Sequence, residues 1–308
     1  MRLTALAGGV GAAKLLSGLV TVLPPKDVTV IVNTGDDFRW MGLYICPDLD
    51  TVTYTLAGLA NPITGWGVRD DTFHSLERLR QMGCETWFKL GDRDLATHIY
   101  RTHHLQNGHS LTDVTLALCQ QNGITAHILP MTDSPVSTLV HTDKGTLEFQ
   151  DYFVRRKCSP IVRGFSFQGI DAASPAPGAH EAIRNADTIV LCPSNPYISI
   201  GPILAVPGIK TALQQTPATV LAVTPIVAGD ALKGPAAAMM RQLGDEVSAV
   251  SIARFYRDFL DVFVLDRRDV ILQEQIAALG IEVRVTETVM DDMASRVALA
   301  RFLLEMPA

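Results

Sequence analysis

Short apolar runs of strand length recur along the chain, and helical patterns separate most of them. The apolar runs lie at 2–7, 27–33, 187–192, 218–223, 262–265 and 281–286. The helical patterns include 12–21, 178–185, 234–243 and 289–305. Strand-length runs that alternate with helices are typical of a doubly wound sheet, so the pattern predicts an α/β fold with a mostly parallel sheet.

The middle of the chain has a different pattern. Residues 71–122 are predicted to be helical with short breaks, and Ser110 with Asp113 fits a capping-box start for the last of these helices. Residues 136–154 alternate with period two around a turn at 143–145, which predicts a hairpin. We therefore expect one α/β domain with a central helical and hairpin insertion. The expected boundaries are 1–308 for the domain, about 1–60 and 160–308 for its core, and about 61–159 for the insertion.

A glycine-rich turn follows the first predicted strand, in the segment LAGGVGAAKLLSG at 6–18. At the start of a helix, backbone N–H groups and the helix dipole can bind a phosphate. The spacing is neither that of a P-loop nor the full GxGxxG of dinucleotide sites, because Lys14 stands where the third glycine belongs. The second strand also ends in Asn33 rather than in a ribose-binding acid. The turn is therefore either an anion cradle at residues 9–12 or a tight turn without a ligand.

Four aspartates follow the second predicted strand: Asp36 and Asp37 in NTGDDF, and Asp48 and Asp50 in CPDLDTV. Ligands of open α/β sheets bind beyond the carboxyl ends of strands, so these acids should lie beside the glycine turn. Carboxylates repel a phosphate unless a cation intervenes, and Mg²⁺ commonly binds one or two carboxylates together with phosphate oxygens. Asp48 and Asp50 flank Leu49, so in an extended segment they would point the same way. The alternative is that the aspartates only cap helices and turns.

Further polar groups follow other predicted strands. Ser194 and Asn195 come after the strand at 187–192 and are candidates for nucleotide contacts. A second strand-to-helix turn with the potential to bind an anion contains Gly229, Lys233, Gly234 and Pro235. The segment KLGDRDLATH at 89–98 is explained without a ligand, as a salt-bridged helix start.

The composition limits the possible functions. The chain has 308 residues and a net charge of -6 without a long basic tract, which disfavours a duplex nucleic-acid partner. Glycines interrupt the N-terminal apolar run, and no apolar stretch approaches the roughly 18 residues of a membrane span, so we expect a cytoplasmic protein. The five cysteines are dispersed without a CxxC pair, which predicts reduced thiols rather than disulfides or a zinc site.

Taken together, the motifs resemble those of the 2-phospho-L-lactate transferase family of coenzyme F-420 biosynthesis, the CofD-like proteins. The motifs that carry the resemblance are, in order, GGVGAAKLLSGL, VNTGDDF, GLYICPDLDTV, LGDRDLATH, SLTDVT, ILPMTDSPVST, FQDYFV, CPSNPYISIGPIL and KGPAAAMM. The resemblance runs from about residue 3 to about residue 300. The chain differs from the family pattern at Ala12, where family members carry a glycine, and this small change should not block the turn.

The resemblance implies a Mg²⁺-dependent transferase with a Rossmann-like core that assembles as a homodimer. Such an enzyme moves a phospho-three-carbon acid from a guanosine-diphosphate-activated donor, such as lactyl-2-diphospho-5′-guanosine. The acceptor is the ribityl hydroxyl of 7,8-didemethyl-8-hydroxy-5-deazariboflavin, and GMP is released. Donors that carry lactate, enolpyruvate or glycerate are not distinguished. A nucleotide-binding regulator of related fold and an NAD(P)-dependent oxidoreductase are the alternatives.

The resemblance and the motifs together imply roles for particular residues. Asp50 and Lys89 are expected to contact the deazaflavin. The candidate catalytic carboxylates are Asp36, Asp37 and Asp50, and the candidate metal ligands are Asp37, Asp48 and Asp50. The expected nucleotide and phosphate contacts are Gly9, Val10, Gly11, Ala12, Lys14, Ser194, Asn195 and Gly234. The flat acceptor ring needs an apolar slot, for which the candidates are Trp66, Trp87, Phe88 and Phe38, with packing in the core as the alternative for each.

Overall fold

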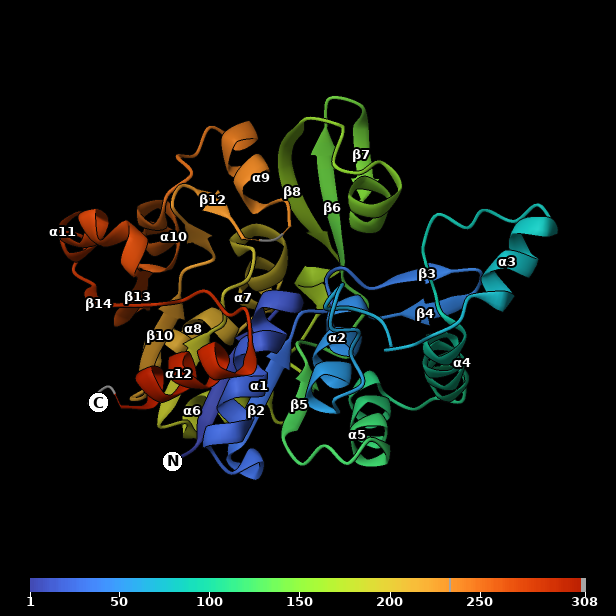
Figure 1. Cartoon of the computed structure of the whole chain (residues 1–308), viewed down its shortest axis with the longest axis horizontal. Coiled ribbons are helices and arrows are strands. Elements are labelled where there is room, and N and C mark those ends of the chain that lie inside the picture. The colour runs from blue at the N-terminus through green and yellow to red at the C-terminus, as the bar shows by residue number, and fades with distance from the viewer. Residues whose placement is uncertain (233, 306–308) are drawn as a thin grey trace.

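The computed structural model describes residues 1–232 and 234–305, and its centre is a seven-stranded sheet (Figure 1). The strand order is β14-β13-β10-β9-β1-β2-β5, and every neighbouring pair is parallel. The strands are β1 (Leu3–Ala7), β2 (Val28–Val32), β5 (His127–Pro130), β9 (Thr188–Leu191), β10 (Thr219–Val223), β13 (Val262–Asp266) and β14 (Glu282–Thr286). The predicted parallel, doubly wound sheet is confirmed, and its strand order reverses between β1 and β9.

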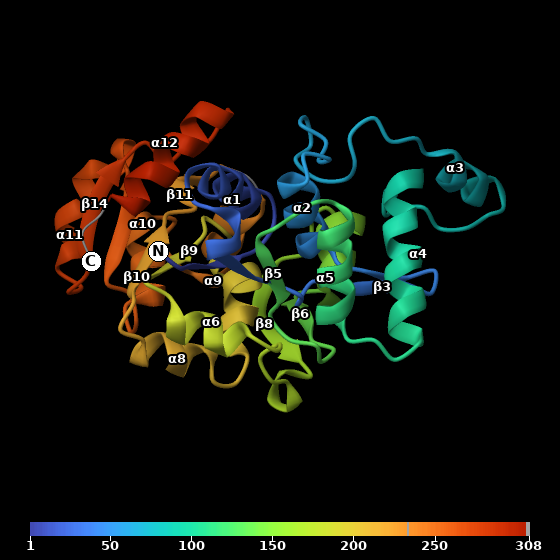
Figure 2. The same cartoon turned by 90° about the horizontal axis from the view of Figure 1, so that it is seen from below.

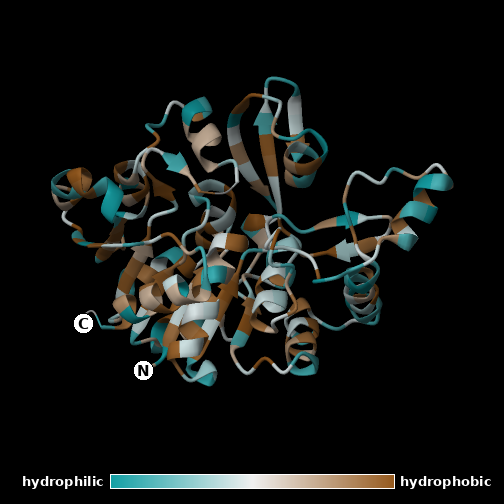
Figure 3. Cartoon of the chain, viewed as in Figure 1, coloured by the Kyte–Doolittle hydropathy of each residue, from teal (hydrophilic) through white to brown (hydrophobic). Residues whose placement is uncertain are grey.

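Helices cover both faces of this sheet, because successive residues of each strand point into two different cores. Ala5 and Val30 pack on one face, and Leu6 and Ile31 pack on the other. The first face is covered by α1 (Val10–Val22), α2 (Pro47–Leu56), α5 (Leu111–Gln121) and α12 (Met293–Leu304). The second is covered by α6 (Ala179–Asn185), α7 (Gly201–Ala205), α8 (Ile209–Gln215) and α10 (Ala249–Tyr256). Figure 2 shows α1 and α12 on the side of the sheet opposite to α6 and α8, and Figure 3 shows that the central strands are mainly hydrophobic.

Two smaller units extend from the β5 side of the sheet (Figure 1). One contains α3 (His74–Gln81), α4 (Asp92–Gln106) and the hairpin of β3 (Phe38–Trp40) and β4 (Leu43–Ile45). The other is a three-stranded antiparallel sheet of β7 (Gly145–Glu148), β6 (Ser137–Thr142) and β8 (Val162–Gln168). The predicted helices and hairpin of the middle region are therefore confirmed, as is the capping box, in which Ser110 Oγ accepts from the Asp113 N–H at 3.0 Å.

The remaining elements are short. The helices are α9 (Ala236–Leu243) and α11 (Gln273–Ala277), the 3₁₀ turns η1 (Pro25–Asp27), η3 (Ile170–Ala172) and η5 (Arg267–Leu272), and the π-helical turns η2 (Asp151–Arg155) and η4 (Pro196–Ile200). A two-stranded ribbon consists of β11 (Ile226–Val227) and β12 (Asp230–Ala231). All five cysteines are free, as predicted. Within the described ranges, no helix combines the length and apolar character needed to cross a membrane.

The predicted boundaries of the insertion differ from those of the structure. β5 lies inside the expected insertion at 61–159, yet it pairs with β2 in the central sheet. β8 lies in the expected core from 160 onward, yet it pairs with β6 outside that sheet. β5 spans only four residues and ends in Pro130, so its apolar run was too short to indicate a buried strand.

Candidate functional site

A cleft of about 900 Å³ lies at the carboxyl edge of the sheet, where the strand order reverses between β1 and β9. This is the position at which open α/β sheets bind ligands. The predicted site residues that line the cleft are Gly9, Val10, Gly11, Lys14, Asp36, Asp48, Asp50, Lys89, Ser194, Asn195 and Gly234. Among the predicted catalytic, metal and nucleotide residues, two do not line it: Ala12 lies on the buried face of α1, and Asp37 is buried outside the lining.

Close packing explains the glycines of the turn. A Cβ atom on Gly11 would lie 2.4 Å from the carbonyl oxygen of Pro193, so no side chain fits there. The N-cap of α1 is Gly9, and the first hydrogen bond of the helix runs from the Ala13 N–H to the Gly9 carbonyl at 3.0 Å. The N–H groups of residues 10–12 precede this bond, so they have no acceptor within the helix and can donate to an anion in the cleft.

Three buried aspartates influence one another through their charges, and we call them the turn-side acids because Asp48 lies against this turn: Asp36, Asp37 and Asp48. Asn33 Nδ2 lies 3.2 Å from Asp36 Oδ1 and 2.9 Å from Asp48 Oδ2, so one amide holds two carboxylates. A Cβ atom on Gly9 would lie 2.7 Å from Asp48 Oδ1, which places this carboxylate against the glycine turn. The expected proximity to the turn is confirmed for Asp48, and Asp36 and Asp50 line the same cleft.

Burial makes the turn-side acids difficult to ionise. It raises the pKa of Asp36 well above its usual range, and the charges of Asp48 and Asp37 add to the shift. Burial also raises the pKa of Asp48 to about 6, although the hydrogen bond from Asn33 opposes this. The pKa of Asp37 is raised by burial as well, and neither of its carboxyl oxygens accepts a well-formed hydrogen bond from the described residues. A cation bound among these acids would lower all three pKa values.

Asp48 and Asp50 do not point the same way, and the expectation of an extended segment here is wrong. Pro47 begins α2, because its fixed φ suits the first position of a helix. Residues two apart on a helix diverge by about 200°. Asp48 therefore lies against the glycine turn, while Asp50 pairs with Arg101 of α4, whose Nη1 is 3.1 Å from Asp50 Oδ2 and whose Nη2 bonds Oδ1.

Asp50 and Asp94 form a second acidic pair in the cleft wall, which we call the helix-side acids. Each has a basic partner on α4: Arg101 for Asp50, and His98, whose Nε2 lies 3.1 Å from Asp94 Oδ1. Burial alone would raise the pKa of Asp94, but the neighbouring His98 and Tyr54 side chains and the charge of Arg101 outweigh it and lower this pKa. The Tyr54 hydroxyl also donates to Asp94, at 2.7 Å.

Aromatic side chains form part of the wall. Trp66, Trp87 and Phe88 line the cleft, whereas Phe38 lies behind them and packs edge-on against Phe88 at a centroid distance of 4.8 Å. Further lining residues, which the sequence did not indicate, come from the unit that contains β6–β8: Phe149, Gln150, Phe153, Val154 and Lys157. Phe149 and Phe153 stack at 5.3 Å. Their four-residue spacing within FQDYFV was the available signal.

The loop after β9 is fixed by its own polar groups. Ser194 Oγ accepts from the Gly8 N–H at 3.2 Å, which ties this loop to the glycine turn. Asn195 caps η4, because its Oδ1 accepts from the Tyr197 N–H at 2.9 Å. Both residues line the cleft, and part of their hydrogen-bonding capacity positions its wall.

The predicted lysines and the second glycine turn also reach the cleft. Lys14 Nζ donates to the Met290 carbonyl at 2.8 Å, and Lys89 is exposed at the cleft wall. Gly234 lines the cleft with φ at 78°, a backbone conformation that favours glycine. Lys233, predicted beside it, lies outside the described residues.

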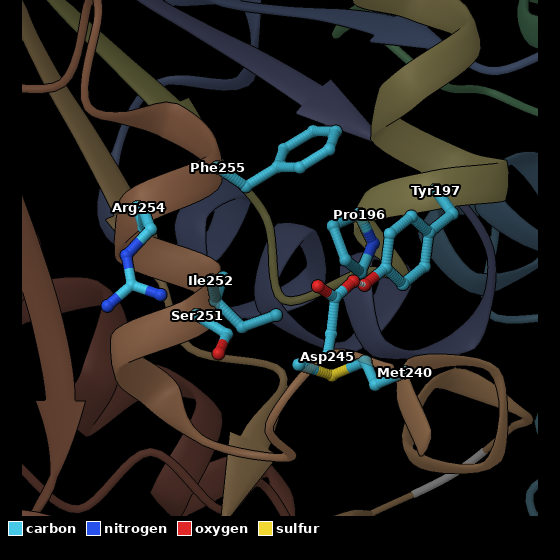
Figure 4. Close-up of a pocket in the computed structure, with 8 residues that line it drawn as sticks. All are labelled: Pro196, Tyr197, Met240, Asp245, Ser251, Ile252, Arg254 and Phe255. Atoms are coloured by element: carbon cyan, nitrogen blue, oxygen red, sulfur yellow. Dashed lines mark hydrogen bonds between the residues drawn. The ribbon is translucent and has the colours of Figure 1, made fainter. Parts of the chain in front are cut away.

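A smaller pocket of about 190 Å³ lies behind η4, and Figure 4 shows its lining residues. Its polar groups include Tyr197 and Asp245, which are hydrogen-bonded to each other. Tyr197 also stacks on Phe165 at 5.7 Å, so the pocket wall fixes η4 against β8. None of the predicted site residues lines this pocket, and the larger cleft is the candidate active site.

The turn-side acids fit a magnesium ion that arrives together with a phosphate ligand. Within the ranges 1–232 and 234–305, no group of three or more His, Cys, Asp or Glu side chains is arranged to hold a metal ion by itself. Mg²⁺ usually takes one or two carboxylates and completes its shell with water and phosphate oxygens. Asp36 and Asp48 supply buried carboxylates of raised pKa beside the glycine turn. The metal therefore stays a prediction that the donor set supports.

Comparisons with known proteins agree with the geometry. Residues 3–303 match the family described as 2-phospho-L-lactate transferase CofD. A 2-phospho-L-lactate transferase of Methanosarcina mazei is 41% identical over 97% of this chain and 98% of its own length. A phosphoenolpyruvate transferase of Streptomyces griseus is 43% identical over 99% of this chain and 98% of its own length. A crystal structure of a UPF0052 family protein from Bacillus halodurans covers 99% of this chain and 98% of its own, with a TM-score of 0.63 and 17% identity, which supports the fold alone.

Proposed function

Since the chain belongs to the 2-phospho-L-lactate transferase CofD family, we propose that it transfers a phospho-three-carbon acid from a guanosine-diphosphate-activated donor to the ribityl hydroxyl of 7,8-didemethyl-8-hydroxy-5-deazariboflavin. In this step the hydroxyl oxygen bonds to the phosphorus that carries the acid. The bond from that phosphorus to the bridging oxygen breaks, and GMP leaves. The hydroxyl proton passes to water or to a cleft carboxylate. The convergence of the glycine turn, the turn-side acids and Asp50 in one cleft carries the proposal.

The donor side is formed by the glycine turn and the loop after β9. The N–H groups of residues 10–12 would bind the diphosphate at the positive end of α1. Gly11 packs against Pro193, so the two loops approach closely enough to share one ligand. Ser194 and Asn195 would contact the nucleotide from the opposite loop.

The acceptor side is formed by Asp50, Lys89 and the aromatic wall. Trp66, Trp87 and Phe88 offer the apolar surface that a flat tricyclic ring requires. Asp50 would accept a hydrogen bond from the acceptor, and Lys89 would contribute a positive charge nearby. Both Asp50 oxygens are engaged by Arg101, so we place Asp50 on this side rather than among the metal ligands.

Asp36 and Asp48 would hold Mg²⁺, with the charge of Asp37 behind them. When bound, Mg²⁺ neutralises charge on the diphosphate and on the departing GMP. The buried acids repel a free diphosphate, so they restrict the site to the metal-bound donor. Positioning and charge neutralisation supply most of the rate in phosphoryl transfer, and the residues described here serve both.

An assay with purified protein tests the function. The protein is incubated with Mg²⁺, the deazariboflavin acceptor and one donor at a time, carrying lactate, enolpyruvate or glycerate. We expect a phosphodiester product and an equal amount of GMP, both identified by mass. Asp48→Asn is expected to lower kcat on the order of 100-fold. Asp187→Asn, at the opposite edge of the sheet before β9, is the matched control and should retain activity.

The other possible results of this assay would each overturn or replace the proposed function. No product from any donor would overturn the proposed transfer. Tight binding of guanine nucleotides without product would favour the regulator, and a fluorescence change of NADH would favour the oxidoreductase. A homodimer is the proposed assembly, and light scattering of the same preparation tests it.

A further inference from the structure

A buried polar network joins α2 to α4 beside the cleft, and the reaction proposed above does not use most of it. Asp50 and Tyr54 lie one turn apart on α2. Asp94, His98 and Arg101 follow one face of α4 at spacings of four and three residues. His98 is 1% exposed and Arg101 is 2% exposed, so the network is shielded from solvent on the α4 side.

The contacts connect all five side chains. Arg101 bonds both oxygens of Asp50, and its Nη1 also lies 3.2 Å from His98 Nδ1. His98 Nε2 lies 3.1 Å from Asp94 Oδ1, and the same oxygen accepts from the Tyr54 hydroxyl at 2.7 Å. The chain of contacts therefore runs from Asp50 through Arg101 and His98 to Asp94 and Tyr54.

The contacts also assign the hydrogens of the imidazole. A guanidinium can only donate, so His98 Nδ1 accepts from Arg101. The hydrogen of the ring then belongs on Nε2, which faces a carboxylate oxygen of Asp94. The imidazole therefore accepts from the guanidinium that holds Asp50, and its other nitrogen lies beside the Asp94 carboxylate without a well-formed hydrogen bond.

Arg101 differs from its neighbours in one respect. Asp50, Tyr54, Asp94 and His98 all line the cleft, whereas Arg101 does not. Any effect of Arg101 on a ligand must therefore pass through its neighbours, and Asp50 is the neighbour that it bonds through both terminal nitrogens. A buried ion pair gives little net stability compared with apolar residues of the same volume, so stability alone does not account for this network.

We infer that Arg101 is a positioning residue for the acceptor, and this inference rests on the proposed function. Its planar guanidinium fixes both carboxylate oxygens of Asp50, which lines the cleft, so their remaining lone pairs are available to a ligand. Asp50 thereby serves as an oriented hydrogen-bond acceptor for a donor group of the deazaflavin. His98 contacts the guanidinium from the other side, and Asp94 lies behind His98.

The test compares Arg101→Lys with the unchanged protein. Lysine keeps the positive charge but loses the two-pronged geometry. We expect the KM and the calorimetric Kd for the acceptor to rise about tenfold, while kcat and the KM for the donor change less than about threefold. His98→Gln can still accept and donate, and it should raise the acceptor KM by about threefold. Arg93→Lys, an exposed position on the same helix, is the matched control and should change nothing.

A double-mutant cycle shows whether Arg101 acts through Asp50. In the Asp50→Asn background, adding Arg101→Lys should leave the acceptor Kd unchanged, because the group that Arg101 positions is already altered. Additive losses would overturn the inference, as would an unchanged acceptor Kd in a folded Arg101→Lys protein. If Arg101→Lys does not fold, an unchanged acceptor KM in His98→Gln overturns it.

The proposed function and this inference fail in different ways. If the unchanged protein neither binds nor transfers the acceptor, the proposed function fails and the inference fails with it. If the unchanged protein is active and Arg101→Lys matches it in every constant, only the inference fails.

Discussion

The cleft contains two groups of buried aspartates, and the fold gives them different partners. The helix-side acids, Asp50 and Asp94, have basic partners on α4. The turn-side acids Asp36 and Asp48 are held by the Asn33 amide and repel each other. As a result, the pKa of Asp94 is lowered by His98, whereas burial raises the pKa of Asp48 to about 6.

This difference separates two roles that look identical in the sequence. A carboxylate with a basic partner in the fold is oriented before any ligand arrives. A buried carboxylate held by an amide and crowded by like charges gains most when a cation binds. The helix-side acids therefore suit recognition of an acceptor, and the turn-side acids suit a metal that accompanies the donor.

The largest expected effect comes from removing the partner of Asp50. Arg101→Met leaves the Asp50 carboxylate buried without its counter-ion, and we expect a loss of about 3–5 kcal/mol in the free energy of unfolding. Urea unfolding near pH 7.5 measures this loss. The double variant Asp50→Asn with Arg101→Met should recover most of it, because no buried charge of the pair remains. A single variant as stable as the parent would show that Asp50 does not depend on this partner.

The next prediction distinguishes the turn-side acids from the helix-side acids by the sign of the change in stability. Asp48 has a pKa of about 6 in the fold against an ordinary value of 3.8, so the native state binds more protons than the unfolded chain between these values. The favourable contribution of Asp48 to the free energy of unfolding is present at low pH and is lost as the pH rises through about 6. Asp48→Asn should therefore stabilise the metal-free protein near pH 7.5, by on the order of 2–3 kcal/mol, and have little effect near pH 4.

Asp94 provides the matched comparison. Its pKa is lowered in the fold, so its contribution is present above the unfolded value and is lost as the pH falls. Asp94→Asn should destabilise the protein near pH 7.5, by about 1–3 kcal/mol. Urea unfolding in the presence of a chelator measures both variants. If the two substitutions shift stability in the same direction near pH 7.5, the distinction between the groups is wrong.

The sequence predicts most of the sheet and the location of the cleft. Six apolar runs correspond to six of the seven central strands, and the residues after β1, β2 and β9 meet where the topology requires. The glycine turn was recognisable because its residues are contiguous. β5 was missed because a four-residue run that begins with an exposed histidine and ends in a proline resembles a loop.

Which of the acids have a basic partner in the fold was not predictable from the local sequence pattern. Arg101 lies 51 residues from Asp50, so no spacing rule connects them. The segment at 89–98 indicated a salt-bridged helix start, and His98 does contact Asp94 within α4. That interpretation could not reveal a partner on α2, because the packing of α2 against α4 is a property of the tertiary fold. The direction of Asp50 also depended on Pro47 starting a helix where an extended segment was expected.

A smaller effect concerns the donor side of the cleft. A Cβ atom at Gly11 would lie 2.4 Å from the Pro193 carbonyl oxygen, and a backbone atom moves less readily than a side chain. Gly11→Ala should cost about 2 kcal/mol in the free energy of unfolding, in the middle of the range for overpacked sites. It should also raise the KM for the donor more than that for the acceptor. Equal changes in both constants would show that the turn does not belong to the donor side.

The smallest effect tests the metal directly. Addition of Mg²⁺ to GDP-saturated protein at ten times its Kd should raise the free energy of unfolding by about 1.4 kcal/mol near pH 7.5. The gain should shrink near pH 5, because the pKa of Asp48 is about 6 without the metal and a protonated carboxyl is a poor ligand. Asp48→Asn should abolish the gain, whereas Arg101→Lys and Asp187→Asn should retain it. Loss of the gain in Arg101→Lys instead would move the metal to the helix-side acids, because Asp50 is the acid that this arginine bonds through both oxygens among the described residues.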